Sequence, residues 1–457
     1  MYYTSFYMTI RGSQMARIKG TSGNNSLVGT AGNDTLIGGS GNDNLSGGTG
    51  TDTAQYAGNI ADYRFANVGG KLMIVGSTEG KDTLTSVEIL QLGNGQLTVN
   101  SGEFQVNTYI TSDQRGPSIT ALADGGFVVG WRSDGQDGSG DGIYAQRYDA
   151  SGIAQGGEFQ VNTYTMGEQT IPRITNLADG GFVVSWHSSQ DGDGYGIYAQ
   201  RYDASGTAQG GEFQVNTVTN LDQYQPSIAA LPDGGFVLSW SSLEQDGSGY
   251  GVYAQRYDAS GTALGGEFQV NTYTTVGQSI SRTTDLANGG FVVTWTSDGQ
   301  DGSGDGIYAQ RYDASGVAQG LEFRVNTYTT SDQQIPSIAA LVDGGFVVSW
   351  ASDGQDGDLF GIYAQRYDAS GAAQGVEFQV NTYFSSDQRG SSIAALADGG
   401  FVVSWRSEGQ DGDGAGIYAQ RYDAAGNAVG LKLTGTNNTE IINLDAGTAG
   451  LVVDGLA

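Results

Sequence analysis

Short runs of apolar and polar residues, separated by glycine-rich turns, recur along most of this chain. Over residues 103–431 the pattern repeats about every 55 residues, and each copy holds four runs rich in aromatic and β-branched residues. In the first copy these runs are 118–122, 126–131, 142–148 and 158–162. One tryptophan marks each of six copies: Trp131, Trp186, Trp240, Trp295, Trp350 and Trp405. A period near 50 with four strands per unit predicts an all-β fold, a six-bladed β-propeller of four-stranded antiparallel blades over 103–435.

Short and long connections alternate within each copy. Asp124-Gly125 predicts a tight hairpin between the first two strands, and residues 149–152 predict a second turn between the last two. In consecutive antiparallel strands both short turns lie at one end of the blade, so the longer loops, 133–141 and 163–172, lie at the other. Binding residues concentrate on loops that a rigid scaffold positions, so we expect function at this loop end.

One strand type occurs before the first complete copy. The sequence Glu-Phe-Gln-Val-Asn begins at Glu103, recurs in the later copies, and has a weak seventh version at 431–435. We therefore expect residues 103–107 to complete the sixth blade and close the ring. Residues 431–435 are the alternative candidate for this closing strand, the latch of the ring.

Residues 20–55 repeat with a period of nine. Four nonapeptides approximate G-G-x-G-x-D-x-U-x, where U is a large apolar residue. Their sixth positions are Asn25, Asp34, Asp43 and Asp52. Glycines allow sharp turns whose carbonyls can face a cation, and carboxylates supply the hard oxygen that Ca²⁺ prefers. The pattern predicts calcium binding; a metal-free Gly/Asn/Asp linker is the alternative.

The nonapeptides resemble the RTX (repeat-in-toxin) family of bacterial proteins. The resemblance implies a short parallel β-roll with Ca²⁺ between successive turns. The ligands it implies are Asp34, Asp43, Asp52 and Asn25, with the turns at Gly32, Gly41 and Gly50. Asn25 replaces the first carboxylate and Ala54 replaces the last apolar residue, so weaker sites are expected at both ends of residues 20–55.

Residues 56–102 predict a β-rich cap or linker. Residues 63–68 and 71–75 flank Gly69-Gly70 as the strands of a β-hairpin. Residues 80–92 are similar to the segment that closes the roll in serralysin-like RTX proteins, so they are expected to cap it. Residues 1–19 are expected to form a disordered extension, with Met1 or Met15 as the true start.

The composition restricts both chemistry and partners. The 457 residues include 20 Lys and Arg against 49 Asp and Glu, and the net charge of -29 disfavours nucleic acid and anionic membranes. The absence of Cys excludes disulfides and thiol chemistry. His187 is the single histidine, at a position that other copies fill with unrelated residues; we expect it on the surface, not in a Ser-His-Asp triad. The N-terminal residues show no secretory signal, and membrane insertion is not expected.

Every repeat loop contains Gln-Asp-Gly, with the aspartates Asp137, Asp191, Asp246, Asp301, Asp356 and Asp411. In two copies a second aspartate follows four residues later, at Asp141 and Asp305. The pairs Asp137/Asp141 and Asp301/Asp305 have a spacing that resembles the start of a calcium loop. No Glu stands at the twelfth position, so the favoured interpretation is an aspartate that caps the amides of its own turn.

Two further residue types recur in every copy. The arginine of Gln-Arg-Tyr-Asp is expected to link neighbouring blades rather than to bind ligand. Tryptophans that end apolar strands are expected to pack between blades, with sugar stacking as the alternative. Both interpretations assign the repeated residues mainly to structure.

Aromatic residues at the loop end are the better candidates for ligand contacts. They are Tyr195, Tyr250 and Phe360 in one loop and Tyr109, Tyr164, Tyr273, Tyr328 and Tyr383 in the other. The repeated aspartates beside them, Asp137, Asp191, Asp246, Asp301, Asp356 and Asp411, are further candidates for ligand contacts. Aromatic rings near fixed polar groups suit neutral sugars. Because the units are nearly identical, several equivalent weak sites are favoured over one catalytic pair of carboxylates.

We therefore expect a secreted, monomeric, calcium-binding protein whose propeller binds extracellular polysaccharide, as a lectin or adhesin does. The alternatives are a polysaccharide hydrolase or lyase, and a structural matrix protein without a discrete ligand. The RTX resemblance implies type I secretion, directed by an uncleaved C-terminal segment, for which residues 436–457 are the candidate.

Overall fold

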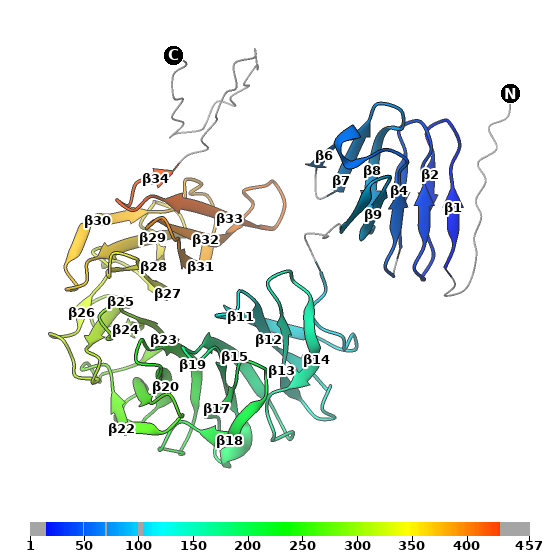
Figure 1. Cartoon of the computed structure of the whole chain (residues 1–457). Helices are drawn as coiled ribbons and strands as arrows, with labels where there is room; N and C mark the ends of the chain where they lie inside the picture. Colours follow the sequence, from blue (N-terminus) through cyan, green and yellow to red (C-terminus); the bar gives the residue numbers. More distant parts are fainter. Residues whose placement is uncertain (1–14, 49, 69–70, 99–103, 430–457) are drawn as a thin grey trace. The chain divides into compact units, whose positions relative to one another are not determined.

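The computed structural model describes residues 15–48, 50–68, 71–98 and 104–429. The chain divides between Val106 and Asn107 into two compact units, each built from β-sheets (Figure 1). Within the described ranges, no helix is long and apolar enough to cross a membrane. The expected N-terminal extension up to residue 14 and the C-terminal tail lie outside these ranges.

The N-terminal unit is a β-roll made of two five-stranded sheets. One sheet has the order β1-β3-β5-β9-β10 and the other β2-β4-β8-β7-β6. The strands are β1 (Arg17–Lys19), β2 (Ser26–Val28), β3 (Thr35–Ile37), β4 (Asn44–Ser46), β5 (Thr53–Gln55), β6 (Tyr63–Val68), β7 (Lys71–Gly76), β8 (Gly80–Thr85), β9 (Ile89–Leu92) and β10 (Gly95–Thr98), with a 3-10 turn η1 (Ile60–Asp62).

Each complete turn of the roll uses two nonapeptides. Strands β1 and β3 pair in parallel with Arg17 opposite Thr35, and β2 and β4 pair with Ser26 opposite Asn44, both 18 residues apart. Successive nonapeptides therefore alternate between the sheets. Their apolar residues point inward, and Leu36, Leu45 and Ala54 are buried in one thin core.

The segment expected to cap the roll instead continues it. Strand β8 pairs in parallel with β4, with Thr83 opposite Asn44, and β9 pairs in parallel with β5, with Ile89 opposite Thr53. The expected hairpin forms between β6 and β7 and lies on the outer side of β8. Residues 80–92 thus add another rung to each sheet because their apolar residues extend the same core.

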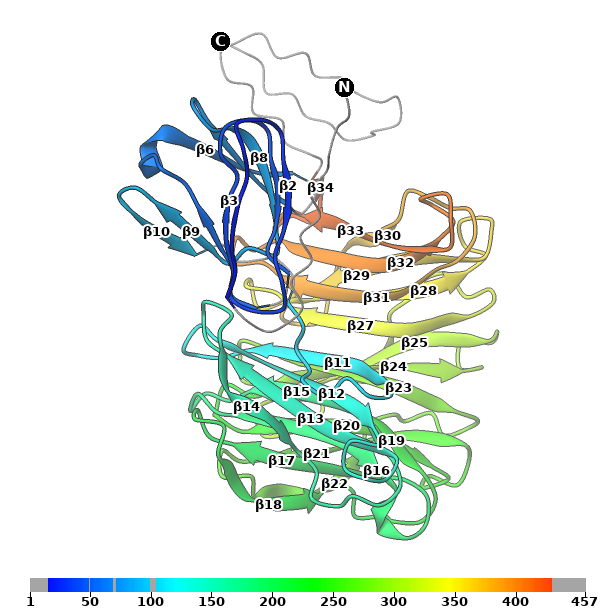
Figure 2. The same cartoon turned by 90° about the vertical axis from the view of Figure 1, so that its right-hand side faces the viewer.

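The second unit contains six four-stranded antiparallel sheets, each built from consecutive strands (Figure 2). Blade 1 has β11 (Gln114–Ala121), β12 (Phe127–Asp134), β13 (Asp141–Tyr148) and β14 (Ala154–Gln160); blade 2 has β15 (Gln169–Asn176), β16 (Phe182–Ser188), β17 (Gly196–Tyr202) and β18 (Ala208–Gln214), with the 3-10 turn η2 (Ser189–Asp191); blade 3 has β19 (Gln223–Ala230), β20 (Phe236–Leu243), β21 (Tyr250–Tyr257) and β22 (Ala263–Gln269).

The remaining blades repeat this arrangement. Blade 4 has β23 (Gln278–Asp285), β24 (Phe291–Asp298), β25 (Asp305–Tyr312) and β26 (Phe323–Arg324); blade 5 has β27 (Gln333–Ala340), β28 (Phe346–Asp353), β29 (Phe360–Tyr367) and β30 (Ala373–Gln379); blade 6 has β31 (Gln388–Ala395), β32 (Phe401–Glu408), β33 (Ala415–Tyr422) and β34 (Ala428–Val429). The six-bladed propeller array predicted from the repeats is confirmed, and its short turns and long loops lie at opposite blade ends.

Neighbouring blades are joined by apolar packing. Trp186 is fully buried in a core that also contains Leu122 and Ile143 of blade 1. Trp240, Trp295, Trp350 and Trp405 pack in the same way against the preceding blade, as predicted. All six tryptophans are at most 6% exposed, so they present no ring for sugar stacking. Blade 6 differs, since Ile417 is 77% exposed whereas its five equivalents are fully buried.

The ring latch differs from the prediction. Glu103 lies outside the described residues, and residues 104–107 form no strand. The fourth strand of blade 6 is β34, which pairs with β33 through Ala428 and Val429. Strand β34 follows β33 directly through the turn at residues 423–427. It can therefore pair with β33 without bringing the start of the propeller to its last blade. The alternative latch at 431–435 lies outside the described residues.

Candidate calcium site and ligand face

Aspartates at the sixth nonapeptide position form two ladders along the roll. Oδ1 of Asp52 accepts a 2.7 Å hydrogen bond from the amide of Asp34, and Oδ1 of Asp43 accepts one of 2.6 Å from the amide of Asn25. Oδ1 of Asp34 accepts a 2.6 Å hydrogen bond from the amide of Ala16. One oxygen of each carboxylate therefore holds the turn that lies one rung away.

The second oxygen of two of these carboxylates has no partner in the protein. Oδ2 of Asp43 and of Asp52 are buried without a hydrogen bond, although both side chains are at most 1% exposed. Oδ2 of Asp34 instead accepts hydrogen bonds from the amide and hydroxyl of Thr30. A buried, unpaired carboxylate oxygen is costly, and a divalent cation is the partner that would compensate it.

Glycines leave room beside these oxygens. A side chain at Gly38 or Gly47 would collide with Oδ2 of Asp43 or Asp52, respectively. Gly41 and Gly50 have φ values of 120° and 129°, a conformation that only glycine adopts without strain, and both turns stack on the glycine turn 18 residues earlier. The backbone carbonyls of these stacked turns are the remaining oxygen donors, so the residues present fit Ca²⁺.

Burial and hydrogen bonding change the pKa of these carboxyl groups. Desolvation raises the pKa of Asp43 and of Asp52, because neither carboxylate gains enough hydrogen bonds to compensate its loss of water. At Asp34 desolvation is outweighed by hydrogen bonds from Thr30 and Ala16, and the pKa is lowered. Asn25 occupies the first rung, where its Oδ1 accepts from the amide of Thr21 at 2.6 Å.

Two acidic residues in the continuing rungs escaped the sequence reasoning. Asp82 in β8 is 1% exposed, accepts a 2.9 Å hydrogen bond from the amide of Asp43, and also has an unpartnered Oδ2. Glu88 accepts a 2.7 Å hydrogen bond from the amide of Asp52. Residues 80–84, Gly-Lys-Asp-Thr-Leu, match Gly32-Asn-Asp-Thr-Leu36 at four of five positions, a signal that could have identified Asp82.

In the propeller, the Gln-Asp-Gly aspartates cap their own loops. Oδ1 of Asp137 accepts from the amide of Ser139 at 3.1 Å, and Oδ1 of Asp246 accepts from the amide of Ser248 at 3.2 Å. The same contact two residues ahead is made by Asp191, Asp301, Asp356 and Asp411. This is the turn-capping arrangement that the sequence favoured.

The two aspartates four residues further on have other partners. Asp141 forms a 2.9 Å ion pair with Arg132. Asp305 accepts a 2.8 Å hydrogen bond from Gln334 and has its pKa raised to about 6, by burial first and by the charge of Asp332 second. Calcium binding by these loops therefore stays a prediction.

The other polar repeat residues connect loops and blades. Nε2 of Gln190 donates to Glu212 at 2.7 Å, and Glu212 accepts a 2.6 Å hydrogen bond from the amide of Thr163 in the loop that precedes β15. Equivalent links hold Glu158, Glu267, Glu322 and Glu377. These glutamates are thus engaged in the scaffold.

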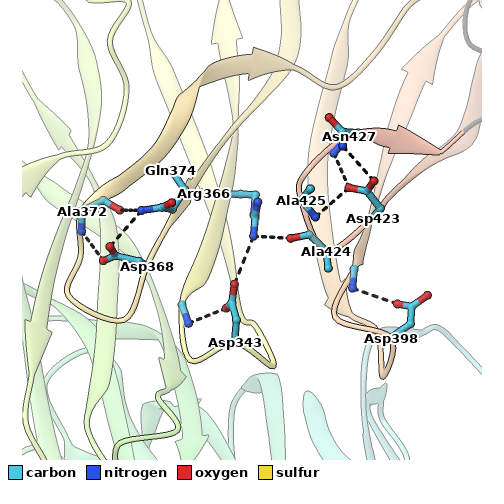
Figure 3. Close-up of polar contacts among 12 residues, drawn as sticks. Asp343, Arg366, Asp368, Ala372, Gln374, Asp398, Asp423, Ala424, Ala425 and Asn427 are labelled. Atoms are coloured by element: carbon cyan, nitrogen blue, oxygen red, sulfur yellow. Dashed lines mark hydrogen bonds and ion pairs between the residues drawn. The ribbon is translucent and has the colours of Figure 1, made fainter.

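The repeated arginines connect each blade to the next, as predicted. Nη2 of Arg366 in β29 donates a 2.8 Å hydrogen bond to the carbonyl of Ala424 in blade 6 and lies 3.4 Å from Asp343 (Figure 3). Arg147, Arg201, Arg256 and Arg311 donate to the corresponding turn of the following blade. Arg421 in blade 6 is paired with Asp398 of its own blade.

The candidate ligand aromatics lie at the loop end, and those of the first loop each make a different contact. Tyr195 donates a 2.8 Å hydrogen bond to Glu168, and the ring of Tyr250 meets that of Tyr224 edge-on. Phe360 is 8% exposed beneath the guanidinium of Arg389. The tyrosines of the second loop, Tyr109, Tyr164, Tyr273, Tyr328 and Tyr383, are half-buried. The first group thus differs from blade to blade, whereas the second recurs in every copy except the third, which has Val218.

The surface position expected for His187 is wrong. Its side chain is only 7% exposed, Nε2 lies 2.5 Å from Oγ1 of Thr170, and its ring meets that of Tyr195 edge-on. The register of β15 and β16 places Thr170 directly opposite His187, and these neighbours cover the ring. Burial, with the charges of Arg132 and Arg173, lowers its pKa to about 4, so the imidazole is neutral at pH 7.

The fold and the site define a calcium-binding β-roll joined to a β-propeller array. Residues 19–54 match the RTX calcium-binding nonapeptide repeat in four copies, which confirms the resemblance for this segment. The repeats of the N-terminal unit are therefore RTX repeats. No curated protein matches the chain.

Several solved structures are similar to this chain at low sequence identity. One is a protein of unknown function from Dyadobacter fermentans, with 14% identity and a TM-score of 0.47, covering 67% of this chain and 93% of that one. An α-L-arabinofuranosidase from Fusarium graminearum in complex with an iminosugar inhibitor has 13% identity and a TM-score of 0.46, with coverage of 69% and 94%. The NanB sialidase from Streptococcus pneumoniae has 8% identity and a TM-score of 0.40, with coverage of 75% and 79%.

Proposed function

We propose that this chain is a secreted, calcium-stabilised binding protein whose propeller loops contact extracellular polysaccharide. The calcium part rests on the unpartnered buried oxygens of Asp43 and Asp52 within matched RTX repeats. In this proposal the roll binds Ca²⁺ outside the cell and is thereby stabilised, because an ion that binds only the folded form shifts the folding equilibrium.

The binding part rests on how the propeller uses its acidic residues. The repeated aspartates cap their loops and the repeated glutamates bridge loops and strands, so these carboxylates are committed to the scaffold. The residues that differ between blades are the aromatics at the loop end, such as Tyr195 and Tyr250. Variable aromatic and polar groups on a rigid scaffold favour recognition over acid–base chemistry at the repeated positions.

Polysaccharide is the ligand class that suits this face best. Half-buried tyrosine rings offer an apolar surface for sugar stacking, and neighbouring acidic side chains such as Glu168 offer acceptors for hydroxyl groups. Several weak contacts on one rigid array would add through multivalency.

The test is a glycan-array screen of the purified chain with and without Ca²⁺. We expect binding to a set of related glycans, stronger in Ca²⁺, and no loss of the bound glycan over time. Shortening of a polysaccharide, measured by released reducing ends, would instead establish a hydrolase or lyase. Absence of binding to every glycan in both conditions would overturn the proposal.

A further inference from the structure

Blades 1 and 2 form a cavity of about 390 Å³ that breaks the six-fold regularity of the array. It is lined by Gly116, Arg132, Thr170, Ile171, Arg173 and His187, and we name it the blade 1–2 pocket. His187 is the single histidine of the chain, so no other blade can reproduce this lining. The lining of this pocket therefore differs from the equivalent positions of the other blades.

Arg173 supplies a positive charge to the blade 1–2 pocket. Its Nη1 donates a 3.1 Å hydrogen bond to the carbonyl of Pro172, and within the described part of the chain no carboxylate forms an ion pair with it. Blades 1, 3, 5 and 6 have serine at this strand position, at Ser118, Ser227, Ser337 and Ser392. The Arg173 side chain is half-buried, and a partly desolvated guanidinium without an ion pair favours an anionic ligand.

Two neighbouring side chains, His187 and Arg132, also favour an anion in the pocket. Nδ1 of His187 is buried and has no hydrogen-bond partner in the protein, while Nε2 is engaged by Thr170. When the Thr170 hydroxyl donates to Nε2, the neutral ring carries its proton on Nδ1 and can donate to an anion. Arg132 lines the same cavity, and its ion pair with Asp141 holds the guanidinium in place.

Arg282 of blade 4 is a second arginine, and its charge interacts with that of Arg173. Arg282 of blade 4 has its pKa lowered to about 10, first by burial and then by the charge of Arg173. Burial also lowers the pKa of Arg173. An anion bound beside Arg173 would offset part of this repulsion.

We propose that the blade 1–2 pocket binds a single oxyanion group, a uronate carboxylate or a sulfate ester, carried by an otherwise neutral sugar. The sugar component rests on the function proposed above; the oxyanion component rests on the pocket alone. The net charge of -29 repels a polyanion, so the ligand carries isolated charges rather than a charge on every residue.

The repeats themselves provide the test variants. Arg173→Ser installs the residue that four other blades have, and His187→Ser installs the residue of blade 3, Ser241, so both variants should fold. Arg406→Ser is the matched control, because Arg406 occupies the position of His187 in blade 6 and is paired with Glu408. Tryptophan fluorescence verifies that each variant is folded.

Isothermal titration would use four probes: an oligosaccharide with one terminal hexuronate, its methyl ester, a singly sulfated oligosaccharide, and inorganic sulfate. We expect wild type and Arg406→Ser to prefer the hexuronate over its ester by about tenfold or more, and Arg173→Ser to lose this preference. His187→Ser should weaken binding of the charged sugars more than of the ester. A preference for the sulfated sugar would assign the oxyanion as sulfate.

Three outcomes separate the two proposals. Equal binding of the hexuronate, its ester and the sulfated sugar by wild type, or an unchanged preference for the charged sugar in Arg173→Ser, overturns the pocket assignment and leaves the proposed function standing. Sulfate binding that depends on Arg173, without binding of any sugar, supports the oxyanion site and contradicts the claim that its ligand is a sugar. Failure of every probe to bind the folded wild type overturns the pocket assignment, and the glycan-array screen then decides the proposed function.

Discussion

The amide of Asp34 donates a 2.7 Å hydrogen bond to Oδ1 of Asp52, while Oδ2 of the same carboxylate is buried without a partner. One oxygen thus holds the preceding rung and the other is left for a cation. The pair Asn25 and Asp43 repeats this relationship on the opposite sheet. Rung stacking and calcium binding therefore depend on the same side chains.

Replacement of Asp52 by Asn should separate these two roles. The amide oxygen can still accept from Asp34, but the NH₂ group in place of Oδ2 is no calcium ligand, so we expect about tenfold weaker Ca²⁺ binding. Calcium titration followed by thermal unfolding of the roll would measure this. The control is Asp124→Asn, which installs the residue that blade 4 has at Asn288. Unchanged calcium affinity in the Asp52 variant would contradict the ligand assignment.

Calcium removal should unfold the roll and spare the propeller. All six tryptophans lie in the propeller, so their fluorescence reports on that unit alone. On addition of a chelator we expect unchanged tryptophan emission, retained β circular dichroism from the blades, and fast hydrogen exchange in residues 17–97. Simultaneous loss of tryptophan and roll signals, or protection of the roll without Ca²⁺, would show that the two units do not respond separately.

Truncation of an inter-blade arginine should destabilise the array. Arg366→Ala removes a hydrogen bond from a charged donor to the carbonyl of Ala424 and leaves that carbonyl unpaired, a loss of about 1.5–3 kcal/mol. Urea unfolding followed by tryptophan fluorescence would measure it. Arg421→Ala is the matched control, since among the described residues no blade follows blade 6 and Arg421 pairs with exposed Asp398 of its own blade. Equal losses in the two variants would contradict an inter-blade role.

Acid should destabilise the propeller through His187. Its pKa is lowered to about 4 in the folded chain, by burial and by Arg132 and Arg173, and lies near 6.5 when unfolded. The unfolded chain therefore binds the proton first, and stability falls as the pH drops below about 6.5, by about 2 kcal/mol between pH 7 and pH 5. His187→Ser should lack this part of the slope. Parallel urea midpoints for variant and wild type across this range would refute the prediction.

The sequence alone was sufficient for the repeated elements of both units, though not for the end of the roll or the latch of the propeller. The nonapeptide period, with one aspartate and one apolar residue per copy, specifies stacked turns because each copy must bury its apolar residue against the next. The 55-residue period likewise specified four strands per blade and the turn-capping role of Asp137 and its equivalents. These are local properties, since turn chemistry and strand alternation depend on residues close in the chain.

The tertiary structure alone decided which residues lose contact with water. Asp82 belongs to the ladder because parallel pairing brings β8 beside β4, 39 residues earlier, across an inserted hairpin. His187 is buried because β15 places Thr170 opposite it. Arg173 lies in a pocket with Arg132 because two blades meet there. Burial and charge pairing arise between segments distant in sequence, so the local pattern that specified the blades could not show them.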